Sequence, residues 1–275
     1  MLRKLLKYDL KAMFRFWWIA AVVSLLMSTM GGFSLLINDI DRPVPEGLQV
    51  VASLLSAMAF LSYTVMFVLS MVLIFLRFYR NFFTDEGYLT FTLPVHRHTL
   101  LNSKIISGML LFLATTAVIG GGFFLMLAIV GHEYVLSVDF LKDIGDFFRS
   151  GMEQMGGYFP VYILEVLLLG VLSCGIFLML LYTCITFGSV IAKKGKVIAS
   201  IAIFYGSCNA LSLMLFLTMI LCIPNISYWM RHLTDKEGYP LIALILLAII
   251  LLEALLCMVM YTLQYRMLKR KLNLS

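Results

Sequence analysis

Two carboxylates, Glu165 and Glu253, lie inside long apolar stretches and are the residues with the clearest chemical potential. A charged group within a bilayer is costly, so such a carboxylate is a default candidate for binding a cation, carrying a proton or contacting a substrate. Glu165 is a few residues from one end of its stretch, where it can reach interfacial water. Glu253 is about ten residues from each end of its stretch, and a rise of about 1.5 Å per residue places it near the bilayer midplane.

Asn209 occupies a depth similar to that of Glu253 in the preceding apolar stretch. A hydrogen bond between the two would satisfy both groups, and both a polar clamp between helices and a site on a transport path remain open. Ala202, Gly206 and Ala210 lie on the stretch of Asn209 at the spacing that lets helices approach closely. The glycines at 120–122 predict a kink or a close helix contact in the third stretch.

Motifs for hydrolysis or nucleotide binding are incomplete. His132 and Glu133 begin the zinc-protease pattern H-E-x-x-H, but Leu136 occupies the position of the second ligand. The Gly-Lys pair at 195–196 is not part of a phosphate-binding loop, and the five cysteines lack the C-x-x-C spacing of a zinc or redox site. We therefore expect no catalytic residue, no metal site, reduced cysteines and no ATP site on this chain.

The elements that carry these residues follow from composition. The chain is 62% hydrophobic and 13% charged, whereas soluble domains are about 45–50% apolar and about 25% charged. A membrane-spanning helix needs about 20 apolar residues, and six runs of that length occur. We predict an all-α integral membrane protein with one transmembrane domain over 1–275. Its spans are expected at about 16–36, 48–75, 105–130, 161–187, 197–223 and 241–263.

Basic residues predict the orientation of these spans. Of the 21 lysines and arginines, 16 lie in the N-terminal segment, the second and fourth connections and the C-terminal tail. The positive-inside rule places those segments, and therefore both termini, in the cytoplasm. We expect a multi-pass protein of a bacterial inner (plasma) membrane.

Two amphipathic segments are predicted beside the spans. In residues 1–15 apolar side chains gather on one helical face, while basic side chains recur every fourth residue from Arg3 to Arg15. This pattern is typical of an interfacial helix on anionic lipid headgroups, and Trp17 and Trp18 are expected to mark the inner interface. In the third connection the apolar spacing over 141–148 predicts a short amphipathic helix on the outer surface.

The second connection, residues 77–104, contains DEGYLTFTLPVHRHTLLNSK from Asp85 to Lys104. The order of an acidic residue and glycine, leucines, Pro-Val-x-Arg and Leu-Leu-x-Ser-Lys resembles the membrane subunit (permease) of type-2 ABC exporters. The plan of six spans with an N-terminal interfacial helix accompanies this motif over the whole chain. His96 departs from the family, which often has Ser or Thr there, as does the long outer connection between spans three and four.

In that family the loop carries a coupling helix that docks on a separate ATPase subunit. The resemblance implies that Thr84 to Leu93 form this helix, and Pro94 locally disfavours its continuation. The coupling residues implied are Asp85, Glu86, Gly87, Leu89 and Pro94. The resemblance also implies ABC ATPase partners that bind ATP and Mg, and a second permease half, identical or different. This chain would bind no cofactor and no nucleic acid, and would not itself be an enzyme.

The sequence thus predicts the permease subunit of an ABC exporter, coupling ATP hydrolysis on a partner to transport of a substrate. Two alternatives stay open. One is a membrane assembly or sensor subunit that transports nothing, and the other is a secondary transporter, for which Glu253 is the one carboxylate near the midplane.

Overall fold

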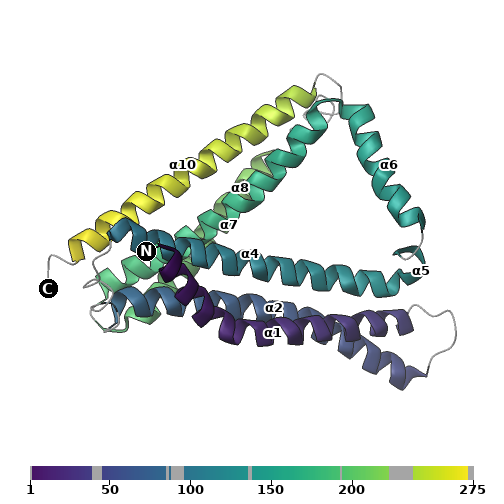
Figure 1. Cartoon of the computed structure of the whole chain (residues 1–275), viewed down its shortest axis with the longest axis horizontal. Coiled ribbons are helices and arrows are strands. Elements are labelled where there is room, and N and C mark those ends of the chain that lie inside the picture. The colour runs from purple at the N-terminus through teal and green to yellow at the C-terminus, as the bar shows by residue number, and fades with distance from the viewer. Residues whose placement is uncertain are drawn as a thin grey trace. The chain divides into compact units, whose positions relative to one another are not determined.

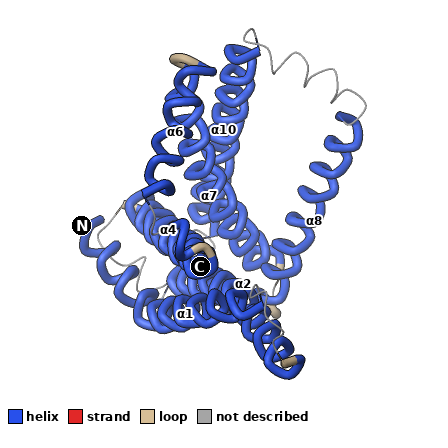
Figure 2. Tube along the Cα trace, turned by 90° about the vertical axis from the view of Figure 1, so that its right-hand side faces the viewer, coloured by secondary structure: helices blue, strands red, loops and turns tan. Residues whose placement is uncertain are grey.

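The computed structural model describes residues 2–38, 45–84, 87, 96–135, 138–192, 194–222 and 238–271, and all regular structure in these ranges is helical (Figure 2). Six of the helices are long and apolar enough to cross a membrane, which confirms the six predicted spans (Figure 1). The six are α1 (Leu2–Asn38), α2 (Glu46–Phe83), α4 (Arg97–Val130), α7 (Tyr158–Ile191), α8 (Lys196–Cys222) and α10 (Tyr239–Lys271). Two shorter helices are α5 (His132–Val135) and α6 (Val138–Met155).

Helix is the conformation that these apolar stretches must take in lipid, because it pairs the backbone groups within the segment. The connection between α7 and α8 shows how such a helix ends. The Ala192 N–H donates to Gly188 O at 3.1 Å, and Gly195 then adopts a φ of +72°, which L side chains rarely adopt. Its carbonyl accepts the Ala199 N–H at 3.0 Å, so α8 begins directly after this glycine.

The chain divides into two compact units, residues 1–145 and 146–275. In the first unit α1 packs against both α2 and α4. A Cβ added to Gly31 of α1 would lie 2.6 Å from Ala59 Cβ of α2, and one added to Gly122 of α4 would lie 2.7 Å from Ser28 Oγ of α1. The triple glycine of α4 thus provides the predicted close contact at its third position, and the helix continues through all three.

Hydroxyl and indole groups join the three helices of this unit. Trp17 Nε1 of α1 donates to Thr115 Oγ1 of α4 at 2.9 Å, and Thr115 also bonds Ser70 Oγ of α2 at 2.8 Å. Trp17 was expected to mark the membrane interface, and its ring is buried in the helix packing, where it contacts protein. Trp18 is 58% exposed and remains free to face lipid.

The predicted interfacial segment 1–15 is not a separate element, because α1 runs without interruption from Leu2 to Asn38. Figures 1 and 2 show its first turns running at an angle to the rest of the helix. Asp9 and Met13 within this segment are buried against protein. One face of the N-terminal turns is therefore taken up by contacts inside the first unit.

In the second unit α7 packs against both α8 and α10. A Cβ on Gly188 of α7 would lie 2.5 Å from Ser200 Cα of α8, so the two backbones meet here. The predicted approach through Ala202, Gly206 and Ala210 was wrong within this chain: all three are exposed, and a Cβ on Gly206 would meet nothing within 4 Å. The reason is rotational, since this stripe lies on a face of α8 turned away from α7.

Helix α6 is the amphipathic helix predicted around 141–148, and it is longer than expected at 18 residues. Its apolar side chains Leu141 and Phe147 are 68% and 66% exposed. The Phe147 and Phe148 rings each also have their centroid 6.0 Å from that of Phe159 at the start of α7. Most of the apolar face of α6 is therefore available for lipid, as an interfacial helix requires.

Candidate functional site

Two cationic side chains, one from α2 and one from α4, meet around the carboxylate of Asp9 of α1. Its Oδ1 accepts Arg77 Nε at 3.0 Å and Arg77 Nη2 at 2.9 Å. Lys104 Nζ of α4 lies 2.6 Å from both Oδ1 and Oδ2 of the same carboxylate. We refer to Asp9, Arg77 and Lys104 as the ionic clamp.

The ionic clamp is largely removed from solvent. The side chains of Asp9 and Lys104 are 3% and 7% exposed, and that of Arg77 is 29% exposed. Buried charges persist only when they are paired and hydrogen-bonded, and removal of one partner strands the other. The clamp therefore holds α1, α2 and α4 in one arrangement more strictly than apolar packing alone.

Asp9 reaches this position because of its place on α1. Asp9, Met13 and Trp17 recur every fourth residue, form one helical face and are all buried. The sequence analysis missed Asp9. The available signal was a lone acidic residue within a strongly basic stretch, on the face with the apolar residues.

The ionic clamp lies at both ends of the connection that carries the resemblance. Arg77 is the first residue of this connection, near the end of α2, and Lys104 is its last, near the start of α4. A displacement of the connection would be transmitted to α1 as well, because Asp9 holds both flanking helices.

The implied coupling residues are mostly outside the described residues. This applies to Asp85, Glu86, Leu89 and Pro94, and so to most of the expected helix over 84–93. Gly87 is described, and its N–H donates to Thr84 O at 2.8 Å. A Cβ at Gly87 would lie 3.0 Å from Phe82 O, so the chain passes close to the end of α2 here.

Glu253 forms its hydrogen bond with a different partner from the one expected. Ser173 Oγ of α7 donates to Glu253 Oε1 at 2.9 Å, while Oε2 is buried and has no partner among the described residues. The predicted bond to Asn209 was wrong, because Asn209 Nδ2 donates to Tyr205 O of its own helix at 2.8 Å and its side chain is exposed. Asn209 shares the exposed face of α8, away from α10.

An open groove of about 390 Å³ surrounds the Glu253 carboxyl. Its described lining is apolar apart from the carboxyl, Cys208 and the hydroxyls of Ser173 and Ser212. A carboxyl inside a membrane span is costly, so it is a default candidate for contact with a polar group or a cation. The groove could therefore receive one polar group of an otherwise apolar molecule.

Glu165 is buried by protein, with 6% of the residue exposed. Its Oε2 has no hydrogen-bond partner in the part of the chain that the structure describes. Nearby in sequence, Tyr162 OH donates to Tyr239 O at 2.6 Å and links α7 to α10. The expected access of Glu165 to interfacial water is thus replaced by burial within the second unit.

Gln264 of α10 is a buried polar residue that the sequence analysis did not identify. Its Nε2 donates to Met179 O and to Thr183 Oγ1 of α7, both at 2.8 Å. The residue is fully buried, and its signal was a single amide just beyond the predicted end of the sixth span. These two bonds link α7 to α10.

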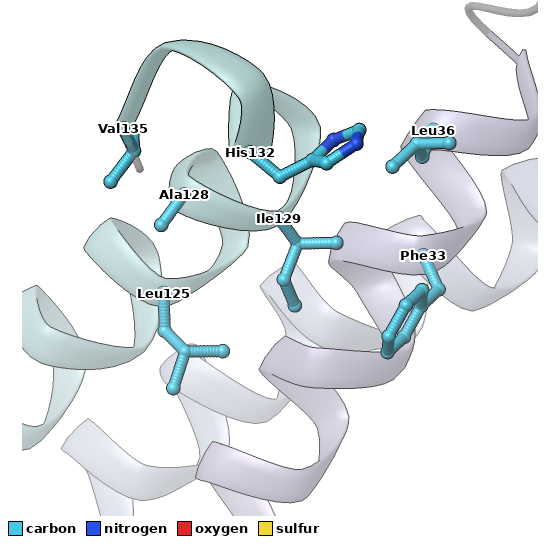
Figure 3. A pocket seen from close by; sticks show the side chains of 7 residues that line it. All are labelled: Phe33, Leu36, Leu125, Ala128, Ile129, His132 and Val135. Carbon is cyan, nitrogen blue, oxygen red and sulfur yellow. The ribbon is translucent and has the colours of Figure 1, made fainter. Parts of the chain in front are cut away.

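A larger groove of about 490 Å³ lies at the other end of the first unit (Figure 3). It is lined by Phe33, Leu36, Leu125, Ala128, Ile129, His132 and Val135. Figure 3 shows the His132 ring on the side of α1, near Leu36. His132 is the one polar side chain in this lining, and no group of three or more His, Cys, Asp or Glu able to hold a metal occurs among the described residues. This groove suits an apolar chain and lacks reactive groups.

The cysteines follow the expected pattern of unpaired packing residues. The four whose side chains are described are free thiols: Cys174, Cys184, Cys208 and Cys257.

Comparison of the chain with models of known protein families, with characterised proteins and with solved structures gives no match.

Proposed function

We propose that this chain is the permease subunit of an ABC exporter, coupling ATP hydrolysis by a separate ATPase subunit to transport of a substrate. The observation that carries the proposal is the ionic clamp, which joins α1 to both helices that flank the connection resembling a coupling loop. The family resemblance implies an ATPase that docks on this connection. The ionic clamp is the contact through which a movement of the connection would reach the membrane-spanning helices.

In the proposed mechanism a cytoplasmic ATPase receives the segment 84–93 in a groove. ATP and Mg bind on that partner, and its closure displaces the segment. Arg77 and Lys104 move with α2 and α4, and Asp9 carries the displacement into α1. A buried, fully paired cluster suits this role because separating its charges is expensive, so the three helices move together.

The proposal includes cytoplasmic termini and a second permease half, identical or different, completing the transport path. Orientation is supported by the 16 of 21 basic residues on the side of the termini. The first turns of α1 would lie against anionic headgroups of the inner leaflet, with their basic residues toward the lipid phosphates.

The experiment is co-purification of this chain with a co-expressed ABC ATPase subunit, together with ATP-driven transport in proteoliposomes. The test variant combines Glu86→Lys with Leu89→Asp, which inverts a charge and polarises an apolar contact. A matched control makes the same two kinds of change in α6, with Asp146→Lys and Leu141→Asp, both at exposed positions. We expect the loop variant to lose the ATPase and the control to retain it.

The proposal fails if both variants co-purify with the ATPase and sustain equal transport.

A secondary transporter is the second candidate, favoured by the Glu253 carboxyl, whose Oε2 lies by a groove and has no partner among the described residues. That function predicts uptake or release driven by an ion gradient in proteoliposomes that contain this chain without any ATPase.

A further inference from the structure

Another groove, of about 450 Å³, lies between α1 and α2, and Arg77 of the ionic clamp is part of its lining. Three arginines line it: Arg15 from α1 and Arg77 and Arg80 from α2. Its described lining contains no carboxylate. The volume is within the range of about 300–1,000 Å³ that small-molecule sites occupy.

The remainder of the lining is mainly apolar, and it is arranged in order along α2. Leu73 and Leu76 precede Arg77 and Arg80 by about one helical turn, so they lie deeper in the apolar stretch. Phe16 faces the same groove from α1 and is 59% exposed. The groove therefore has a basic part toward the end of the helices and an apolar part toward their middle.

We propose that this groove binds an anionic phospholipid, with the headgroup phosphate among Arg15, Arg77 and Arg80 and an acyl chain along Leu73, Leu76 and Phe16. Guanidinium groups present paired N–H donors that match phosphate oxygens, which favours arginine for this role. The bonds from Arg77 to Asp9 fix its guanidinium in place before a ligand arrives.

The apolar part of the groove selects lipid over soluble phosphate. A free phosphate would leave Leu73, Leu76 and Phe16 uncovered, whereas an acyl chain would lie against them. Helix α1 also begins with a strongly basic segment, which draws anionic lipid toward this end of the molecule. The proposal does not depend on the transport function, because any membrane protein with this groove could hold the lipid.

The test is a pair of double variants with equal change of net charge. Arg15→Gln with Arg80→Gln removes two groove cations, whereas Lys7→Gln with Lys11→Gln removes two exposed cations of α1 outside the groove lining. Purified full-length protein in nanodiscs would be titrated with phosphatidylglycerol, phosphatidylcholine or inorganic phosphate. Retained lipid would be counted by native mass spectrometry, and the melting temperature would report stabilisation by ligand.

We expect wild type to retain phosphatidylglycerol through detergent exchange and to melt at a higher temperature in its presence, with no effect from inorganic phosphate. Each double variant lacks two cations and therefore attracts anionic lipid to the protein surface less strongly than wild type. The groove variant should lose roughly a further tenfold in affinity, because it also loses direct phosphate contacts. A third variant, Leu76→Trp, keeps every charge but fills the groove and should also release the lipid.

Equal weakening in the two double variants would overturn the proposal, since it would show attraction to the surface rather than a site. If Leu76→Trp retained as much phosphatidylglycerol as wild type, the proposed position of the acyl chain in the groove would be overturned. Stabilisation by inorganic phosphate equal to that by phosphatidylglycerol would overturn the choice of lipid. An unchanged melting temperature without added lipid in all variants shows that each is folded, so a lost anionic lipid cannot be attributed to unfolding.

Discussion

At the scale of single residues, Asp9 is the side chain that connects the three long helices of the first unit through its charge. One carboxylate accepts hydrogen bonds from two cations on two other helices, and it is 2% exposed. The residue was missed in the sequence because charge counting treats residues 1–15 as a basic segment. Its burial depends on which face of α1 meets α2 and α4, and that is decided by packing across about 70 to 95 residues of chain separation.

Asp9→Asn should lower the free energy of unfolding by about 3–5 kcal/mol, because it removes the buried carboxylate that both Lys104 and Arg77 bind. Thermal or denaturant unfolding in detergent would measure the change. Asp139→Asn is the control, since the Asp139–Lys142 pair is 71% and 66% exposed and such pairs contribute about 0–1 kcal/mol.

A combined Asp9→Leu and Lys104→Met variant should be less destabilised than Asp9→Asn, because it removes the Lys104 charge together with that of Asp9. Arg77, which keeps its charge, is partly exposed and can reach water. Equal stability of wild type and Asp9→Asn would remove the ionic clamp as a structural element.

At the scale of helices, the sequence predicted existence and length better than rotation. Six apolar runs require six spanning helices, and the structure has them. The face that each helix presents is a finer property, because one residue turns the helix by about 100°. Asn209 was expected toward Glu253 from its depth alone, yet it lies on the exposed side of α8, and Ser173 of α7 takes the place opposite Glu253.

The same limit explains the glycines. Spacing identified Gly206 as a contact, but the closest approach of α7 and α8 is at Gly188 and Ser200. A contact between helices depends on both partners, and a small-residue pattern on one helix describes only one of them. Gly188 lies near the end of α7, where the Ser200 backbone rather than a second small-residue stripe meets it.

Gly188→Ala and Gly206→Ala should therefore change stability in opposite directions. The first places a Cβ 2.5 Å from backbone atoms of Ser200 and should cost about 1–3 kcal/mol, as overpacking does. The second meets nothing within 4 Å and should stabilise α8 by up to about 1 kcal/mol through helix propensity. Melting temperatures of the two purified variants decide the matter, and a shift of the same sign in both would contradict the assigned α7–α8 contact.

At the scale of the whole molecule, composition determined the class of protein. A chain that is 62% hydrophobic with six spanning runs has the composition of a multi-pass membrane protein. What composition does not encode is the grouping into two compact units, 1–145 and 146–275, each with one helix packed against two others. The polar contacts inside each unit, through Thr115 in the first and Gln264 in the second, specify that grouping.

The proposed function rests at this scale on force passing from a partner into the first unit. The ionic clamp makes α1, α2 and α4 respond as one body, and the segment between Arg77 and Lys104 is where a partner would act. The groove lined by Arg15, Arg77 and Arg80 shares Arg77 with the clamp, so an anionic lipid bound there would contact both α1 and α2 and stabilise their packing.

The most direct measurement is site-specific crosslinking from this segment to the ATPase subunit. Glu86→Cys in a cysteine-free background would carry a short thiol-reactive crosslinker, and Asp146→Cys in α6 would serve as the matched control. The account predicts that position 86 crosslinks to the ATPase, with a yield that changes when ATP is added, and that position 146 does not. Crosslinking from position 146, or its absence from position 86 while the ATPase co-purifies, would contradict the coupling role of this segment.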